Sequence, residues 1–167
     1  LVRALKSSPH IDAAYVGYPG GAFFQIMRAT RSPRWHAAVA APDDAVFAMR
    51  VVTRPPDGPA LARWHFLDGD GRVIGAGPER EVDFDPRRRP WYRAAVAADG
   101  PVTIGPYVSA STQALALTVA VTMAKAKDAV MGADVMLETI SNMLVEQPVS
   151  EHSSGYVFDG DGRLIVH

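Results

Sequence analysis

The feature that most constrains the fold is an alternation of large and small side chains over residues 115–123. Successive side chains of a β-strand point to opposite faces, so a period of two predicts a strand with its large residues on one face. The chain therefore has to contain a sheet. The large residues are Leu115, Leu117, Val119, Val121 and Met123, and between them lie Ala116, Thr118, Ala120 and Thr122.

Turn residues divide the N-terminal half into further predicted strands. Residues 12–27 are rich in Tyr, Val, Phe and Ile and predict a hairpin, with its turn at Pro19-Gly20-Gly21, where glycine allows a positive φ. Residues 45–53 and 60–67 predict two more strands, because Pro55-Pro56-Asp57-Gly58 between them is a strong turn sequence.

Helices are predicted at three places. One begins at Pro33, after the capping hydroxyl of Ser32, and another has Pro90 in its first turn. A third follows a predicted strand over residues 130–134 and ends before Pro148. Its amphipathic stripe consists of Met136, Leu137, Ile140, Met143 and Leu144.

One internal repeat is visible. Residues 66–74 and 157–165 each contain an apolar pair, an Asp-Gly-Asp-Gly-Arg turn and a second apolar pair. This pattern predicts two β-hairpins. The alternative, a calcium loop, lacks a third carboxylate and a distal bidentate glutamate at the required spacing.

Composition excludes several kinds of site. The 167 residues fit one domain with part of a second, and 48% hydrophobic residues can form a core. A formal net charge of -1 gives no general attraction to nucleic acid, and the absence of cysteine excludes disulfides and thiolate sites. We expect no metal or cofactor, because the histidines lack metal-ligand spacing. They are His10, His36, His65, His152 and His167.

The densest group of candidate binding residues lies in residues 84–95. Arg89 precedes the predicted helix, so its guanidinium, together with the donors of Trp91 and Tyr92, can form a wall that recognises an anion. In the alternative interpretation, Arg87 to Arg89 are a solvated basic patch and Trp91 is a core aromatic. A charge run on its own favours that alternative.

This segment also carries a family resemblance. FDPRRRPWYRAA is followed by GPYVSAS, a Thr/Val-rich strand, GADVMLETI and GYVFDGDGRLIVH. Together they resemble the double Cache sensor domains of bacterial membrane receptors, and YVGYPGGAFFQ and HFLDGDGRVIG resemble the membrane-distal half of such domains. The resemblance implies an α+β, PAS-like fold, in which an antiparallel sheet flanked by helices forms a pocket for a small molecule outside the cytoplasm.

The resemblance also implies roles for particular residues. Arg89 and Trp91 would bind the carboxylate of an amino-acid-like ligand, Tyr92 and Tyr107 would complete the wall, and Asp134 would accept the ammonium.

The sequence departs from the family pattern at Phe84, where the motif has tyrosine. The missing phenol removes a hydrogen bond to a charged group, worth about 1.5–3 kcal/mol, which puts an unmodified α-amino acid in question. Two alternatives also remain open. Asp134 could instead cap the helix that follows it, and Tyr107 could be a strand aromatic packed on the sheet.

At the scale of the chain, the resemblance implies a membrane-distal module over residues 1–150 and the start of a truncated membrane-proximal module over residues 151–167. The first residue is Leu1, and the most apolar stretch, residues 114–124, is too short to span a bilayer, so we expect membrane anchors outside this chain. The predicted protein is a periplasmic small-molecule sensor of an inner-membrane receptor and forms a homodimer.

The favoured output of that receptor is an adenylate or guanylate cyclase, with histidine kinases and chemoreceptors as alternatives. Two other functions remain open. One is an interaction module without a ligand, and the other is a hydrolase that uses Asp85, Asp134 or a histidine, although no nucleophile and base have suitable spacing.

Overall fold

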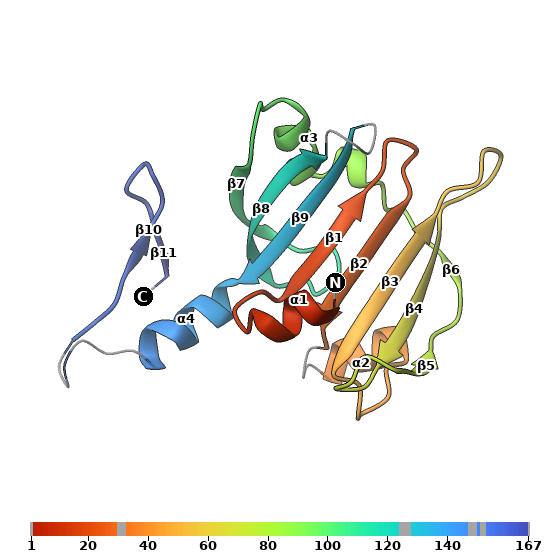
Figure 1. Cartoon of the computed structure of the whole chain (residues 1–167), viewed down its shortest axis with the longest axis horizontal. Coiled ribbons are helices and arrows are strands. Elements are labelled where there is room, and N and C mark those ends of the chain that lie inside the picture. Colours follow the sequence, from red (N-terminus) through yellow and green to blue (C-terminus); the bar gives the residue numbers. More distant parts are fainter. Residues whose placement is uncertain (1, 30–32, 124–127, 147–149, 151–152, 167) are drawn as a thin grey trace.

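The computed structural model describes residues 2–29, 33–123, 128–146, 150 and 153–166. Within them, the chain folds around a nine-stranded antiparallel sheet (Figure 1), which confirms the predicted α+β, PAS-like class. Across the sheet the strands follow the order β5 (Val73–Ala76), β4 (Leu61–Leu67), β3 (Phe47–Thr53), β2 (Phe23–Arg28), β1 (Ala13–Gly17), β9 (Ala129–Met136), β8 (Leu115–Met123) and β7 (Val102–Val108), and β6 (Arg80–Glu81) pairs with β4.

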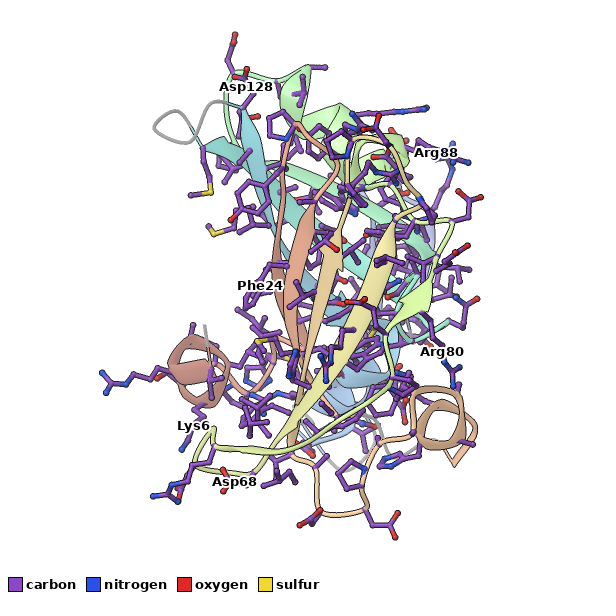
Figure 2. The ribbon with its side chains drawn as sticks, turned by 90° about the vertical axis from the view of Figure 1, so that its right-hand side faces the viewer. Lys6, Phe24, Asp68, Arg80, Arg88 and Asp128 are labelled. Atoms are coloured by element: carbon purple, nitrogen blue, oxygen red, sulfur yellow. The ribbon has the colours of Figure 1, made fainter. Side chains whose placement is uncertain are left out.

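Helices lie on both faces of the sheet, and Figure 2 shows α1 and α2 on opposite sides. The face that α2 and α3 cover is called the inner face here, and the face that α1 covers is the outer face. Two of the predicted helix signals, Ser32 and Pro148, lie outside the described residues. The helices are α1 (Val2–Ser7), α2 (Pro33–Val39), α3 (Pro90–Val96), preceded by the short 3₁₀ helix η1 (Pro86–Arg88), and α4 (Leu137–Glu146).

The predicted hairpins are confirmed. β1 and β2 pair around a tight turn in which Gly21 has a φ of 84°. In the first copy of the repeat, Oδ1 of Asp68 accepts hydrogen bonds from the backbone N–H groups of Asp70 and Arg72, both at 2.9 Å. Asp159 holds the turn of the second copy in the same way, between β10 (Val157–Phe158) and β11 (Leu164–Val166). Both acidic turns thus stabilise hairpins.

The strand β8 confirms the predicted alternation, and its large residues lie on the outer face. Leu115 and Val119 are 49% and 51% exposed, whereas Ala116, Thr118 and Ala120 are fully buried toward α3. The inner face therefore has small side chains where α3 and the large aromatics pack against it. The alternation fixes which residues share a face but not which face is buried.

Each face has its own core. On the inner face, aromatic residues from strands and helices pack together, among them Tyr15, Phe23 and Trp91. On the outer face, Leu5 of α1 packs with Ile26, Phe47 and Leu67, which are named here as one small cluster. The aromatic core on the inner face is the part that shapes the candidate site.

The beginning of α4 is capped from a distant part of the chain. Asp12 accepts a hydrogen bond from the backbone N–H of Met136 at 2.7 Å and another from Oγ1 of Thr139 at 3.0 Å. The carboxylate therefore holds the residue just before α4 and a side chain of its first turn, and a negative charge at this end of a helix is favourable. The capping role considered for Asp134 thus belongs to Asp12.

Candidate ligand-binding site

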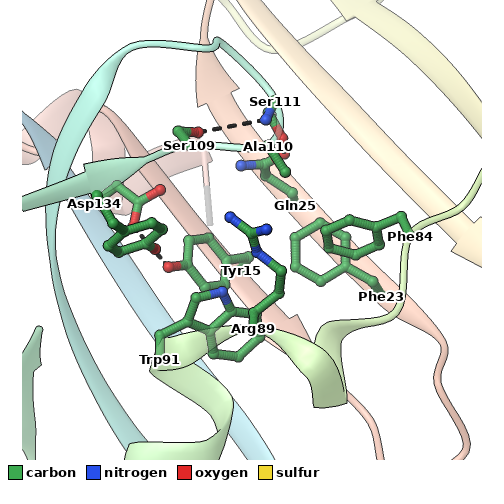
Figure 3. Close-up of a pocket in the computed structure, with 11 residues that line it drawn as sticks. Tyr15, Phe23, Gln25, Phe84, Arg89, Trp91, Ser109, Ala110, Ser111 and Asp134 are labelled. Atoms are coloured by element: carbon green, nitrogen blue, oxygen red, sulfur yellow. Dashed lines mark hydrogen bonds between the residues drawn. The ribbon is translucent and has the colours of Figure 1, made fainter. Parts of the chain in front are cut away.

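A small cavity of about 20 Å³, partly open to solvent, lies on the inner face of the sheet. Its floor comes from β1, β2 and β9, and its walls come from residues 84–91 and from residues 107–111 (Figure 3). Segments that are far apart in sequence therefore meet around one small space. The lining residues are Tyr15, Phe23, Gln25, Phe84, Arg89, Trp91, Tyr107, Ser109, Ala110, Ser111 and Asp134.

Asp134 provides the negative charge of this cavity. It lies within β9, is 3% exposed, and its Oδ1 accepts hydrogen bonds from Oη of Tyr15 and Oγ1 of Thr118, both at 2.6 Å. Oη of Tyr107 lies 2.7 Å from Oγ1 of Thr118 and donates to it, because the hydroxyl hydrogen of Thr118 is directed to Asp134. Among the described residues Oδ2 has no hydrogen-bond partner, so this oxygen is left for a ligand.

Burial controls the ionisation of this network. Desolvation raises the pKa of Asp134 to about 6, and the hydrogen bonds from Thr118 and Tyr15 and the positive charge of Arg89 limit that rise. The pKa of Tyr15 and that of Tyr107 are raised as well, first by burial and then by the charge of Asp134. At neutral pH the cavity therefore contains an ionised carboxylate and neutral phenols.

The positive charge of the cavity comes from Arg89, which behaves differently from the two arginines before it. Arg87 forms an ion pair with Asp85 at 2.6 Å, and Arg88 forms one with Asp83 at 3.0 Å. Arg89 lines the cavity, donates from Nη2 to the carbonyl of Val108 at 3.0 Å, and lies over the ring of Tyr107 at 5.8 Å. The basic run thus consists of two surface ion pairs and one guanidinium at the cavity.

Trp91 is held at the cavity by a close approach to β1. Its ring packs on Tyr15 with centroids 4.8 Å apart. A Cβ at Gly17 would lie 2.8 Å from Cη2 of Trp91, so this approach requires glycine. Nε1 of Trp91 has no hydrogen-bond partner among the described residues, and a ligand carboxylate beside Arg89 can accept from it.

The end of the cavity away from Asp134 is both aromatic and polar. Phe84 packs against Phe23 at 4.8 Å, so the position where the family motif has a phenol is apolar here. Beside it, Oγ of Ser111 donates to Oε1 of Gln25 at 2.6 Å. The cavity therefore combines a negative group, a positive group, and a mixed surface for the remainder of a ligand.

Five of the six residues predicted for the site line this one cavity, namely Phe84, Arg89, Trp91, Tyr107 and Asp134. The sixth, Tyr92, is buried elsewhere, and its hydroxyl donates to the carbonyl of Asp128 at 3.2 Å.

Sequence analysis missed the contribution of Tyr15, Phe23, Gln25, Thr118 and the segment 109–111. The aromatic pattern of the first hairpin was visible, but the residues alone suggest only packing for it. Gln25 and Thr118 carry no local pattern that distinguishes them from other strand residues.

Other kinds of site find little support in the described part of the chain. It contains no group of three or more His, Asp or Glu side chains that could hold a metal ion, and His152 and His167 lie outside it. Asp85, considered for hydrolysis, is occupied by Arg87 and caps η1. Across the same residues, the helices are too short and too polar to cross a bilayer.

No family model matches the sequence. Among curated proteins, adenylate cyclase 1 of Rhizobium meliloti is 41% identical over all 167 residues, which are 25% of its own length. The methyl-accepting chemotaxis protein PscA of Pseudomonas syringae is 33% identical over 90 residues, which are 53% of this chain and 14% of that protein. The chain thus spans about a quarter or less of these relatives.

Solved structures share the fold. The ligand-binding domain of the Pseudomonas fluorescens chemoreceptor CtaA in complex with L-serine matches 99% of this chain and 50% of its own, with a TM-score of 0.54 and 24% identity. That of the Pseudomonas aeruginosa amino acid chemoreceptor PctB in complex with L-Arg matches 98% and 49%, with a TM-score of 0.55 and 22% identity. The chain therefore has the fold of these chemoreceptor ligand-binding domains, which matches the Cache resemblance, and its sequence relatives are an adenylate cyclase and chemotaxis proteins.

Proposed function

We propose that this chain is the extracytoplasmic sensing domain of a bacterial membrane receptor and binds a small molecule that carries both a carboxylate and an ammonium. The observation that carries this proposal is the presence of Arg89 and Asp134 on one sheltered cavity. A guanidinium binds a carboxylate in a planar fork, and a buried carboxylate requires a cation beside it. A zwitterion satisfies both at once.

The relatives support the same ligand class. The CtaA and PctB domains, which share this fold, are described in complex with L-serine and L-Arg. In our proposal the ligand carboxylate lies between Arg89 and Nε1 of Trp91, and its ammonium contacts Oδ2 of Asp134. Tyr15 and Thr118 position Asp134 by holding Oδ1. Tyr92, outside the cavity lining, would support the wall through the helix that it shares with Trp91.

Phe84 affects which zwitterion fits. Its ring packs against that of Phe23 at an angle of 56° and adds apolar surface where a phenol would donate a hydrogen bond. The ligand therefore loses one polar contact at this wall, and an apolar substituent facing Phe84 and Phe23 compensates for the loss. We propose a modified or apolar-substituted amino acid as the ligand, in preference to a small polar one.

Isothermal titration against a panel of amino acids, their N-acetyl and deaminated analogues, and small carboxylates tests the proposal. We expect Arg89→Ala and Asp134→Ala each to weaken binding about 10-fold to 100-fold, since each removes a hydrogen bond to a charged group. Arg88→Ala is the matched control, because Arg88 pairs with Asp83 at the surface. Equal affinity in the wild type and both cavity variants would contradict the assignment. A thermal shift that responds to no compound would favour a pure interaction module.

The remaining parts of the proposal concern the whole receptor. The chain covers about half of the chemoreceptor domains and a quarter of the cyclase, so residues 151–167 would begin a second, membrane-proximal module. We propose a homodimeric inner-membrane protein with anchors outside this chain. The 41% identity with adenylate cyclase 1 favours a cyclase output, and the chemotaxis relatives favour the alternative. Fusing this domain to each output and measuring cyclic AMP or kinase activity would distinguish the two.

A further inference from the structure

A second cavity lies on the inner face, beside the first one. It measures about 180 Å³, is partly open to solvent, and lies between β3, β4, α2 and residues 78–82. Strand register links the two cavities, because Tyr15 pairs with Gln25, Gln25 with Arg50, and Arg50 with Trp64. These four side chains form one row across the sheet, from the first cavity to the second.

Arg50 stands between the two cavities. Its guanidinium lies 4.7 Å from the ring centre of Phe84, and Nη1 is 3.4 Å from Oγ of Ser111; both of these residues line the first cavity. Arg50 itself lines the second, where its guanidinium lies 5.6 Å from the ring centre of Trp64. The guanidinium of Arg50 is therefore accessible from the second cavity and packs against residues that line the first cavity.

Within the part of the chain that the structure describes, the charge of Arg50 has no acidic partner. The side chain is 7% exposed, none of the ion pairs among the described residues includes it, and its Nε is buried without a hydrogen bond. Burial lowers the pKa of Arg50 to about 10, which still leaves it charged at neutral pH. A buried cation held only by aromatic rings and one hydroxyl is electrostatically incomplete, and a bound anion would supply the missing charge.

A second guanidinium lies at the rim of the same cavity. Arg80 is exposed in β6, where it pairs with Ala62 of β4, and its guanidinium donates a hydrogen bond of 3.4 Å to the carbonyl of Ala38. It is on the same side of the sheet as α2 (Figure 2). The other walls are mainly apolar and include Val39, Ala62 and Val82. The cavity thus has two cations, one indole and an aliphatic wall.

We propose that this second cavity binds a small organic carboxylate. The anionic group would pair with Arg50 and Arg80, since guanidinium groups match the planar geometry of a carboxylate. The apolar body would pack on Trp64 and Val39, which a phosphate or sulfate ion could not use. The site is separate from the one in the proposed function, and a receptor with both would respond to two ligands.

Benzoate is a suitable probe, with benzamide as its uncharged counterpart of the same shape. Binding is followed by the indole N–H signals of Trp64 and Trp91 in ¹H–¹⁵N spectra, assigned with Trp64→Phe and Trp35→Phe because the chain has three tryptophans. Trp64 lines the second cavity and Trp91 the first, so the signal that moves identifies the occupied site. We expect benzoate to move the Trp64 signal with millimolar or tighter affinity, and benzamide to bind at least about 10-fold more weakly.

Two variants and one control complete the test. Arg80→Ala, a surface change, should weaken benzoate binding about 10-fold, and Arg50→Met should abolish it while keeping an apolar stem in the core. Arg63→Ala is the control, because Arg63 is an exposed arginine on the opposite face of β4 and should bind benzoate as the wild type does.

Three results would overturn the proposal: no shift of Trp64 at about 10 mM benzoate, equal binding of benzamide, or unchanged affinity in Arg80→Ala. A shift of Trp91 alone would place benzoate in the first cavity. It would reject the second site and leave the proposed function intact.

Discussion

Ionised Asp134 lowers the free energy of unfolding, because the hydrogen bonds of its neighbours offset only part of the desolvation of its charge. Its pKa is raised to about 6 in the folded protein, so between about pH 4 and pH 6 the folded state binds more protons than the unfolded state. Stability therefore falls as pH rises through that range, by at most about 3 kcal/mol for a shift of this size. Above pH 6 the empty site retains an ionised carboxylate.

Asp134→Asn should separate stability from binding. The amide oxygen can still accept from Tyr15 and Thr118, while the buried charge is gone. We expect the variant to be about 1–2 kcal/mol more stable than the wild type at pH 7.5, because it avoids most of that electrostatic cost. The difference should shrink toward pH 4.5, where the wild-type carboxyl is protonated. Urea unfolding at both pH values measures it.

The same variant should lose affinity for a zwitterionic ligand, which titration at pH 7.5 would show. A variant that is less stable than the wild type at pH 7.5, or a stability difference independent of pH, would show that the hydrogen bonds of Asp134 outweigh its desolvation.

At the scale of single residues, charge and the family motif identified the charged residues of the site, whereas the residues that pack around them were not predicted. Arg89 and Asp134 are recognisable in the sequence because each lies in a motif segment. Tyr15 and Thr118 are not, because their role depends on strand register: Thr118 lies opposite Asp134 on β8, and Tyr15 on β1 lies opposite Gly132, two residues before Asp134. Residues that bind through charge are therefore easier to predict than residues that position them.

At the scale of elements, the close contact between β1 and β9 fixes Tyr15. A Cβ at Gly132 would lie 2.3 Å from Cε2 of Tyr15, far inside van der Waals contact. Tyr15 lies directly opposite Gly132, and its ring crosses the glycine before its hydroxyl reaches Asp134. The absence of a side chain on β9 thus allows the hydrogen bond on which the site depends.

Gly132→Ala should displace the ring of Tyr15 from Asp134. We expect a loss of about 1–3 kcal/mol in unfolding free energy from overpacking, and at least about 10-fold weaker ligand binding because Asp134 loses a donor. Gly20→Ala is the matched control, since nothing lies within 4 Å of its added Cβ. Thermal unfolding and titration measure both effects. Wild-type affinity in Gly132→Ala would mean that Tyr15 does not position Asp134.

Local patterns predicted the elements well and their long-range partners poorly. The hairpin of β1 and β2, the strands β3, β4 and β8, and the helix α4 all follow from alternation, turns or helical periodicity. The cap of α4 comes from Asp12, more than 120 residues earlier. Nothing in the neighbourhood of residue 136 could identify that partner, so the nearer Asp134 was the natural sequence candidate.

At the scale of the whole molecule, the C-terminal hairpin is peripheral. β10 and β11 form a separate two-stranded sheet, no residue of α4 is buried, and Tyr156 and Phe158 are exposed (Figure 1). Deleting residues 151–167 should change the melting temperature by less than about 3 °C and leave ligand affinity unchanged. Calorimetry and titration of the shortened chain check this. A large loss of stability would show that the hairpin belongs to the main domain.

The family resemblance predicted the overall architecture, since its motifs extend over nearly the whole chain. It gave no indication of the second cavity, which arises because Arg50 and Trp64 share one row of the sheet and α2 packs beside them. Neither residue belongs to a recognisable motif. Such a feature depends on register and helix placement together, and both become visible only in three dimensions.

The small side chains of β8 on the inner face bear on how ligand binding would change the stability of the fold. This strand contributes alanine and threonine on that face, and α3 packs directly against it, so a ligand would bind beside a surface that is already closely packed. A ligand at about 100 times its dissociation constant adds about 3 kcal/mol to the free energy of unfolding, which is typically about 5–15 kcal/mol in total. In the proposed receptor, this added stability is the free energy with which a ligand could shift the domain toward its bound conformation.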